Sequence, residues 1–143
     1  TGAEVRAGDA VRQADLRRDD ADAARARLED LVAEQEVVAV AAMLRVINVL
    51  ENERSARDLI NRMKVATSQA QANELGNLAN SEILDAIEVL VGGGLHRKAQ
   101  KEFFNAGLDV HEAGEAATVT DRVAFANKAL THLTTAKNDI IAP

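Results

Sequence analysis

Cysteine, tryptophan and tyrosine do not occur in this chain of 143 residues, and its one proline is Pro143. Without cysteine there is no disulfide bond, no thiolate nucleophile and no sulfur-ligated metal. The aromatic side chains are Phe103, Phe104 and Phe125, whereas grooves for single-stranded nucleic acid rely on several stacked rings. The sequence therefore excludes thiol chemistry and disfavours a base-stacking site.

Excess positive charge is also missing, since 23 acidic residues stand against 17 basic ones and the net charge is −6. The arginines of the first 30 residues are interleaved with aspartates and glutamates, which is typical of a mixed-charge helix face. A nucleic-acid partner usually requires a basic surface. We therefore expect no nucleic-acid partner.

Glycine and proline are both absent from residues 9–75. A stretch of that length without helix breakers predicts helix. Its apolar residues fit heptads, with one seam through Ala21, Leu28, Ala42, Val49, Ala56, Met63 and Ala70 and another through Ala24, Leu31, Val38, Leu59 and Ala66. One helix over 20–75 is possible, but the polar cluster Asn52–Ser55 and the capping pattern of Ser55 with Asp58 favour a hairpin turn there.

The rest of the chain is divided by glycine and by capping residues. Gly76 is expected to end a helix, Ser81 to begin a short helix through Val91, and residues 92–94, three glycines, to form a flexible joint. Further helices are predicted from about Leu95 to 111 or 113, ended by Gly114, and from Thr118 or Thr120 to about Asn138. The predicted fold is all-α: a multi-helix bundle of about five helices with a long N-terminal helical or coiled-coil-like stretch, in a single helical domain over 1–143.

The apolar residues of the later helices predict which faces are buried. One face of the short helix carries Ile83, Leu84, Ile87, Leu90 and Val91. The next helix has a main stripe of Leu95, Ala99, Phe103, Ala106 and Val110, and a second stripe of Phe104 and Leu108. Because both stripes are apolar, this helix is expected to be covered on two sides.

The longest apolar run extends from Val37 to Leu50. Its fourteen residues fall short of the roughly 20 that a membrane-spanning helix needs, so we expect no membrane span and a helix that is buried instead. Hydrophobic residues make up 47% of the chain and are mainly Ala, Val and Leu. Small side chains bury little area per contact, so such a helix needs a long packing surface or a partner. A chain that begins at Thr1 rather than Met is expected to be a processed or excised piece, and no compartment is indicated.

Two patterns resemble ligand sites. The three glycines before a basic helix start (His96, Arg97, Lys98) resemble an anion cradle, but without a Walker or dinucleotide signature a tight turn is favoured. The sequence HEAGE at 111–115 is one residue from the zinc-protease pattern, and one hypothesis brings His111, Glu115 and, from the next helix, His132 together on a divalent metal. Because bundle metal sites usually use Glu-x-x-His pairs and none occurs, we expect no metal, no cofactor and no catalytic residue.

The apolar run itself provides the predicted interface. Arg45 and Asn48 interrupt it, and each is either an interface specificity device or a side chain that reaches the surface at the helix edge. The predicted interface residues are Val38, Ala42, Arg45, Val46 and Val49.

Three classes of function agree with these observations. The favoured one is a structural or self-associating helical protein, an assembly subunit of a filament, shell or scaffold, whose partner is itself or another helical protein. The alternative is a ligand-sensing or signal-transmitting helical bundle, although the sequence shows no polar cluster to line a pocket and no small-molecule substrate is evident. A metal-dependent enzyme is the least supported, so the protein is predicted not to be an enzyme.

Overall fold

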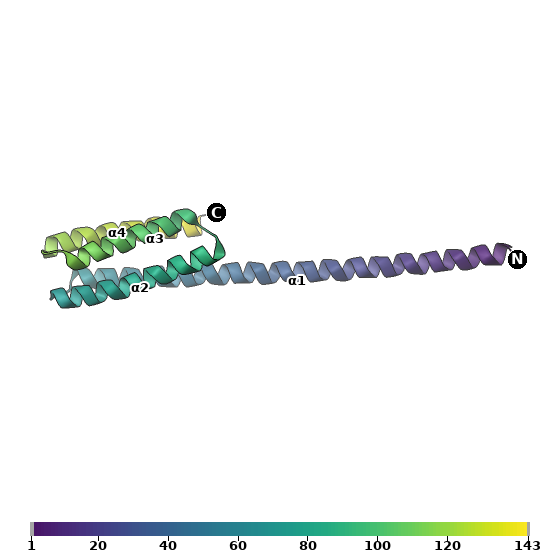
Figure 1. Ribbon diagram of the computed structural model, residues 1–143, viewed down its shortest axis with the longest axis horizontal. Helices are drawn as coiled ribbons and strands as arrows, with labels where there is room; N and C mark the ends of the chain where they lie inside the picture. The colour runs from purple at the N-terminus through teal and green to yellow at the C-terminus, as the bar shows by residue number, and fades with distance from the viewer. Residues whose placement is uncertain (1, 143) are drawn as a thin grey trace. The chain divides into compact units, whose positions relative to one another are not determined.

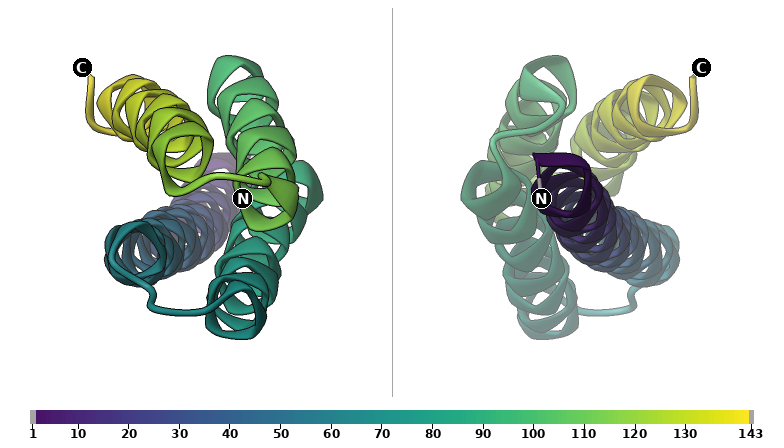
Figure 2. Two further views of the ribbon diagram at one scale, coloured as in Figure 1. Left: turned by 90° about the vertical axis from the view of Figure 1, so that its left-hand side faces the viewer. Right: turned by 90° about the vertical axis from the view of Figure 1, so that its right-hand side faces the viewer.

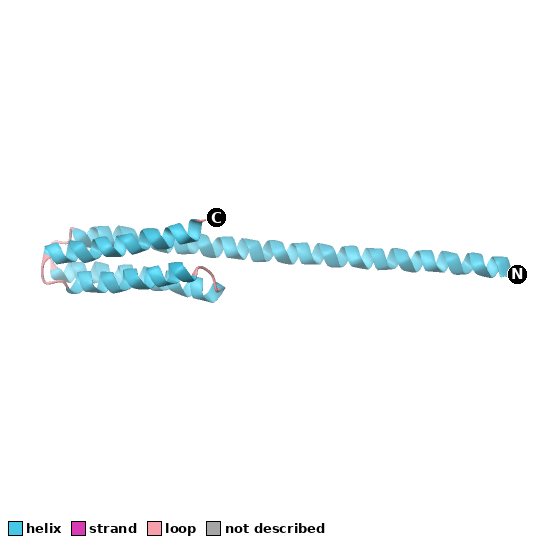
Figure 3. Cartoon of the chain, turned by 90° about the horizontal axis from the view of Figure 1, so that it is seen from above, coloured by secondary structure: helices cyan, strands magenta, loops and turns pink. Residues whose placement is uncertain are grey.

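The part of the chain that the structure describes folds into four helices joined by short connections. Figures 1 and 3 show these helices in chain order. The computed structural model describes the backbone of residues 2–142, and the side chains of residues 8, 11, 12 and 16–142. Helix α1 is Gly2–Lys64, α2 is Gln69–Gly93, α3 is Arg97–Glu115 and α4 is Val119–Ile141. No strand occurs within the described backbone, so the predicted all-α fold with a long N-terminal helix is confirmed, with four helices rather than about five.

Two compact units divide the chain between Ala41 and Ala42. The first is residues 1–41, of which the structure describes the N-terminal part of α1 from Gly2 onward. The second, residues 42–143, contains the remainder of α1 together with α2, α3 and α4. All the packing between helices described below belongs to this second unit, which we call the bundle.

Short connections make successive helices of the bundle antiparallel neighbours, and Figure 2 shows the bundle helices from their two ends. Buried positions recur at intervals of three and four residues, which is the heptad spacing of coiled-coil packing. These positions are Val49, Glu53, Ala56, Ile60 and Met63 in α1; Ala72, Gly76, Ala79, Ile83, Ala86 and Leu90 in α2; Ala99, Phe103, Ala106, Val110 and Ala113 in α3; and Arg122, Ala126, Ala129, Leu133, Ala136 and Ile140 in α4.

Small residues let the backbones of α2 and α3 approach closely. Half of the buried apolar residues of the described chain are alanine, and two glycines of α2 and α3 lie close to side chains of other helices. A Cβ at Gly76 would lie 3.0 Å from Cε of Met63, and one at Gly107 would lie 3.3 Å from Oδ1 of Asn80. Gly76 does not end a helix, as predicted, but lies inside α2, where an added Cβ would press on the end of the Met63 side chain.

Of the predicted helix N-caps, Thr118 is confirmed and Ser81 is wrong. The Thr118 hydroxyl accepts a hydrogen bond from the Asp121 amide, which confirms Thr118 as the N-cap of α4. The N-cap of α2 is Ser68 rather than Ser81, which lies in the helix interior. Helix α3 has no side-chain cap of its own, and the Asp139 carboxylate of α4 accepts a hydrogen bond from the Ala99 amide at 3.1 Å instead.

The predicted turn at Asn52–Ser55 is wrong, since α1 continues to Lys64. The core stripe passes through this region by way of Glu53 and Ala56, and burial of that stripe outweighs the local polarity. Of one predicted heptad seam, Val49, Ala56 and Met63 are buried and Ala42 is half-buried, whereas Ala21, Leu28 and Ala70 are exposed. The other is displaced by one position, because Ile60 is fully buried while Leu59 is only partly so.

The outer faces of α2 and α3 are less covered than predicted. Ile83 and Leu90 are buried, but Leu84 and Val91 are exposed. In α3 the main stripe is buried from Ala99 to Val110, whereas Phe104 is 58% exposed and Leu108 is exposed as well. Helix α3 is therefore covered on one side and not on two.

Candidate functional site

Part of α1 exposes an unusual amount of apolar side chain. Nine large apolar residues between 28 and 47 are each 43–70% exposed: Leu28, Leu31, Val32, Val37, Val38, Val40, Met43, Leu44 and Ile47. Soluble chains rarely leave a contiguous apolar surface of this kind uncovered unless it binds something. We call these nine residues the exposed apolar segment of α1.

Within the segment, Val37, Val40, Leu44 and Ile47 follow one another at intervals of three, four and three residues. That spacing places them in one stripe along the helix. In the bundle, the positions that face the core are Val46 and Val49, which lie on the opposite side of α1 from Leu44 and Ile47. The stripe therefore points away from the core over the part of α1 that belongs to the bundle.

The predicted interface residues are distributed over both sides of α1. Val49 is buried in the bundle core, Val46 packs against that core, and Ala42 is half-buried. Val38 and Arg45 are exposed. The stripe residues Val37, Val40, Leu44 and Ile47 were missed by the sequence reasoning, although their spacing was the available signal.

Arg45 and Asn48, the polar residues of the apolar run, both reach the surface. A Cβ at Gly93 would lie 3.3 Å from Cδ of Arg45, so the arginine side chain extends over the last turn of α2. A cation is favourable at a helix C-terminus because the helix dipole is negative there. This contact accounts for Arg45 within a single chain.

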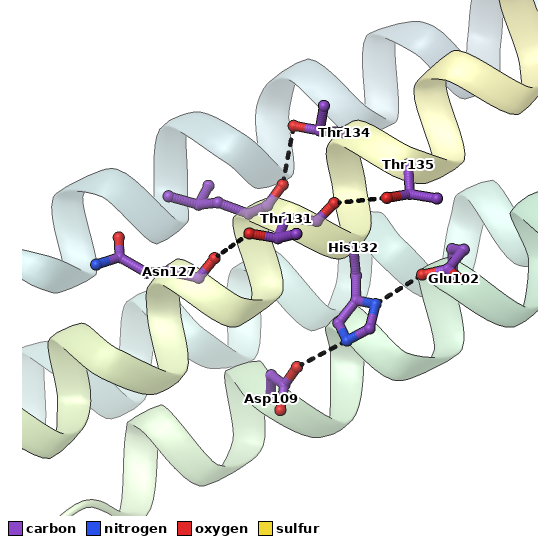
Figure 4. A network of polar contacts seen from close by, with 8 residues as sticks. Glu102, Asp109, Asn127, Thr131, His132, Thr134 and Thr135 are labelled. Atoms are coloured by element: carbon purple, nitrogen blue, oxygen red, sulfur yellow. Dashed lines mark hydrogen bonds and ion pairs between the residues drawn. The ribbon is translucent and has the colours of Figure 1, made fainter.

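His132 of α4 lies between two carboxylates of α3, as Figure 4 shows. Nδ1 is 2.6 Å from Oε2 of Glu102, and Nε2 is 3.3 Å from Oδ2 of Asp109. Glu102 and Asp109 are seven residues apart, so they lie on the same face of α3. Each ring nitrogen is directed at a different carboxylate, so neither nitrogen is directed at a shared metal position.

The other candidate metal ligands are not brought to His132. Nε2 of His111 is 3.4 Å from Oε1 of Glu115, one turn along α3, and both side chains are exposed. No group of three His, Asp or Glu side chains among the described residues is arranged to hold a metal ion. The hypothetical convergence of His111, Glu115 and His132 is therefore not seen.

At the glycine turn, residues 92–94, backbone amides donate hydrogen bonds to carbonyl groups of the last turn of α2. The Gly94 amide donates to the Val91 carbonyl at 3.1 Å, and the Leu95 amide donates to the Leu90 carbonyl at 3.2 Å. Gly94 has a φ of 64°, the left-handed conformation that glycine adopts at helix C-termini. Amides that are already bonded in this way are not available to an anion, which favours the turn interpretation over the anion cradle.

A pocket of about 230 Å³ lies between α2 and α3. Its polar lining includes Asn73, Asn77, Asn80, His111 and Glu115. The Gln69 side-chain amide donates to the Gly114 carbonyl beside this pocket. Sequence reasoning found no polar cluster of this kind, because the three asparagines belong to α2 and the charged residues to α3.

Two buried charged residues have structural partners. The Glu53 carboxylate is 2.7 Å from Nη2 of Arg57, whose guanidinium also donates to the Thr134 hydroxyl at 2.9 Å. Nη1 of Arg122 donates to the Ala66 carbonyl at 2.9 Å, just after the end of α1. These contacts join α4 to α1 and to the connection that follows α1, and they define no ligand site.

Comparison with known proteins gives no relative for this chain. No family model matches it, no curated protein matches it, and no solved structure matches it. Among the described residues no helix combines the length and the hydropathy that crossing a membrane requires. The proposals below therefore depend on the chain's own residues.

Proposed function

We propose that this protein is a structural, self-associating subunit, and that it assembles through the exposed apolar segment of α1. The bundle already has a complete core of buried side chains at heptad positions. The exposed apolar segment contributes nothing to that core. A function in assembly explains why such a surface is present.

The single observation that carries the proposal is the exposure of nine large apolar side chains between Leu28 and Ile47. Burial of apolar surface stabilises by roughly 25 cal/mol per Å², and stable protein interfaces bury about 800 Å² per partner. Nine side chains on one helix provide surface on this scale. The segment is apolar in several directions, so a partner helix covers one side of it at a time.

The test is the mass of the chain in solution over a concentration series. We expect a mass above that of one chain, rising with concentration. Leu44→Asp puts a charge into the exposed apolar segment and is expected to weaken association by at least about tenfold, equivalent to about 1.4 kcal/mol. Ser81→Asp adds the same charge at an exposed position of α2 and serves as the matched control.

Two results would contradict the proposal. One is a parent chain whose mass stays at 15.3 kDa at every concentration. The other is equal association of the parent and Leu44→Asp. Helicity measured by circular dichroism on the same samples separates a loss of association from a loss of folding.

The polar pocket between α2 and α3 favours a second candidate, a ligand-sensing bundle. Three asparagines, a histidine and a glutamate supply donors and acceptors around about 230 Å³, which suits a small polar molecule. A thermal-shift screen of small polar metabolites tests this candidate. A shift that Asn77→Leu abolishes would support it, and a strictly monomeric chain would place it ahead of assembly.

A further inference from the structure

The apolar stripe on α1 begins and ends in charged residues. At the same heptad positions, Asp30 precedes Val37 and the positions after Ile47 are Glu51, Arg54 and Asp58. Helix α1 is continuous over all of them, and each of these charged side chains is exposed. We call the whole series from Asp30 to Asp58 the outward stripe.

We propose that the outward stripe pairs with the same stripe of a second copy of this chain, in antiparallel orientation and centred on Ala42. This inference rests on the proposed function and adds the orientation and register of the pairing. It is carried by the order of apolar and charged residues along α1.

The apolar residues match in this register. About a centre at Ala42, residues at equal distance on either side lie opposite each other in the two copies. Val37 then faces Ile47 of the second copy, and Val40 faces Leu44. By symmetry each pair occurs twice, so four successive layers between the helices are apolar.

The charges that flank those layers also match. Asp30 lies opposite Arg54 of the second copy, and Glu51 lies opposite Ala33, a residue with no charge. In a parallel, in-register pair the same residues would face their own copies, so that Asp30 would lie beside Asp30 and Arg54 beside Arg54. Like charges that face each other destabilise a helix pair, so the sequence of charges favours the antiparallel arrangement.

Charged residues on the two flanks of the outward stripe are also complementary between the copies. In an antiparallel pair, each flank of one helix faces the corresponding flank of the other. This brings Asp20 near Arg62 of the second copy and Asp22 near Lys64. Exposed ion pairs are individually weak, so their effect is to select the orientation while the apolar layers supply the affinity.

Disulfide trapping tests the orientation directly, because the parent chain has no cysteine. Val37→Cys and Ile47→Cys are made as separate variants and oxidised alone and as a mixture. We expect the mixture to form a cross-linked dimer and each variant alone to form little. Cross-linking of Val37→Cys with itself would indicate the parallel pair and overturn the inference, whereas a mass that still rises with concentration would leave the proposed function standing.

Charge reversal gives a second, independent test. Residues 30 and 54 are 24 positions apart on one continuous helix, far more than the three or four positions over which side chains of one helix meet. Asp30→Arg and Arg54→Glu are each expected to raise the dissociation constant by roughly 3–30-fold, and the double variant is expected to return it to within about threefold of the parent. A double variant as weak as the two losses combined would overturn the antiparallel register, and a parent chain with no association would overturn the proposed function as well.

Discussion

The bundle core and the exposed apolar segment contain the same aliphatic residue types, but these side chains are buried in the core and exposed in the segment. Val49 is fully buried in the bundle, and Val38, eleven residues earlier on the same helix, is 67% exposed. In the bundle, buried residues recur at intervals of three and four with polar residues between them, so one face of each helix is satisfied by its neighbours. Between 37 and 47 nearly every position is apolar, so no single face contains them all.

This difference indicates what each region requires. A helix with one apolar face completes its packing inside a small bundle. A helix that is apolar in several directions needs partners on more than one side. The bundle is therefore expected to be stable as a single chain, and the exposed apolar segment is expected to act between chains.

The largest expected effect comes from placing the same charge on opposite sides of α1. Val46→Asp points a carboxylate at the bundle core and is expected to lower the free energy of unfolding by about 2 kcal/mol or more, because the charge has no partner there. Leu44→Asp, two residues away and exposed, is expected to cost at most about 0.5 kcal/mol. Urea unfolding at a dilution where the chain is monomeric measures both, and equal losses would show that the two sides of α1 do not differ.

Some features of the bundle could be predicted from the sequence, and others could not. The α3 stripe, the Thr118 cap and the glycine turn were predictable, because each depends on spacing or on residues adjacent in the chain. The continuity of α1 through Asn52–Ser55 was not predictable, because burial of Glu53 and Ala56 against the other helices outweighs the local polarity there. Gly76 was wrongly predicted to end a helix for the same reason. It lies inside α2 beside the Met63 side chain, which belongs to another helix.

The candidate surface was only partly predictable for a related reason. The sequence predicted an interface in the apolar run, which stays a prediction, but it did not indicate which side of the helix would meet the bundle. Val46 and Val49 differ from Leu44 and Ile47 only in their angular position on α1. Which side of α1 is buried depends on the apolar faces of α2, α3 and α4. The sequence of the segment 37–50 alone does not contain that information.

A smaller effect is expected inside the bundle at His132, whose two carboxylate contacts join α4 to α3. His132→Ala removes both contacts and leaves Glu102 and Asp109 without their shared partner, at an expected cost of about 1 kcal/mol. His111→Ala is the control, because the exposed His111–Glu115 pair is expected to contribute less than about 0.3 kcal/mol. Chemical unfolding compares the two, and a larger loss for His111→Ala would contradict this account of the bundle.

The smallest expected effect is at the glycine turn, where two neighbouring positions should respond in opposite directions. Gly92 lies within α2, and a Cβ there would meet nothing within 4 Å. Gly92→Ala is therefore expected to stabilise the bundle by about 0.5 kcal/mol, because alanine favours the helix over the unfolded chain. Gly94 has a φ of 64°, so Gly94→Ala is expected to destabilise by about 1 kcal/mol. Thermal unfolding gives the sign of each change. Neither substitution should alter the mass of the assembly, because the turn lies in the bundle and outside the outward stripe; a change in mass with either one would mean that this end of the bundle takes part in association.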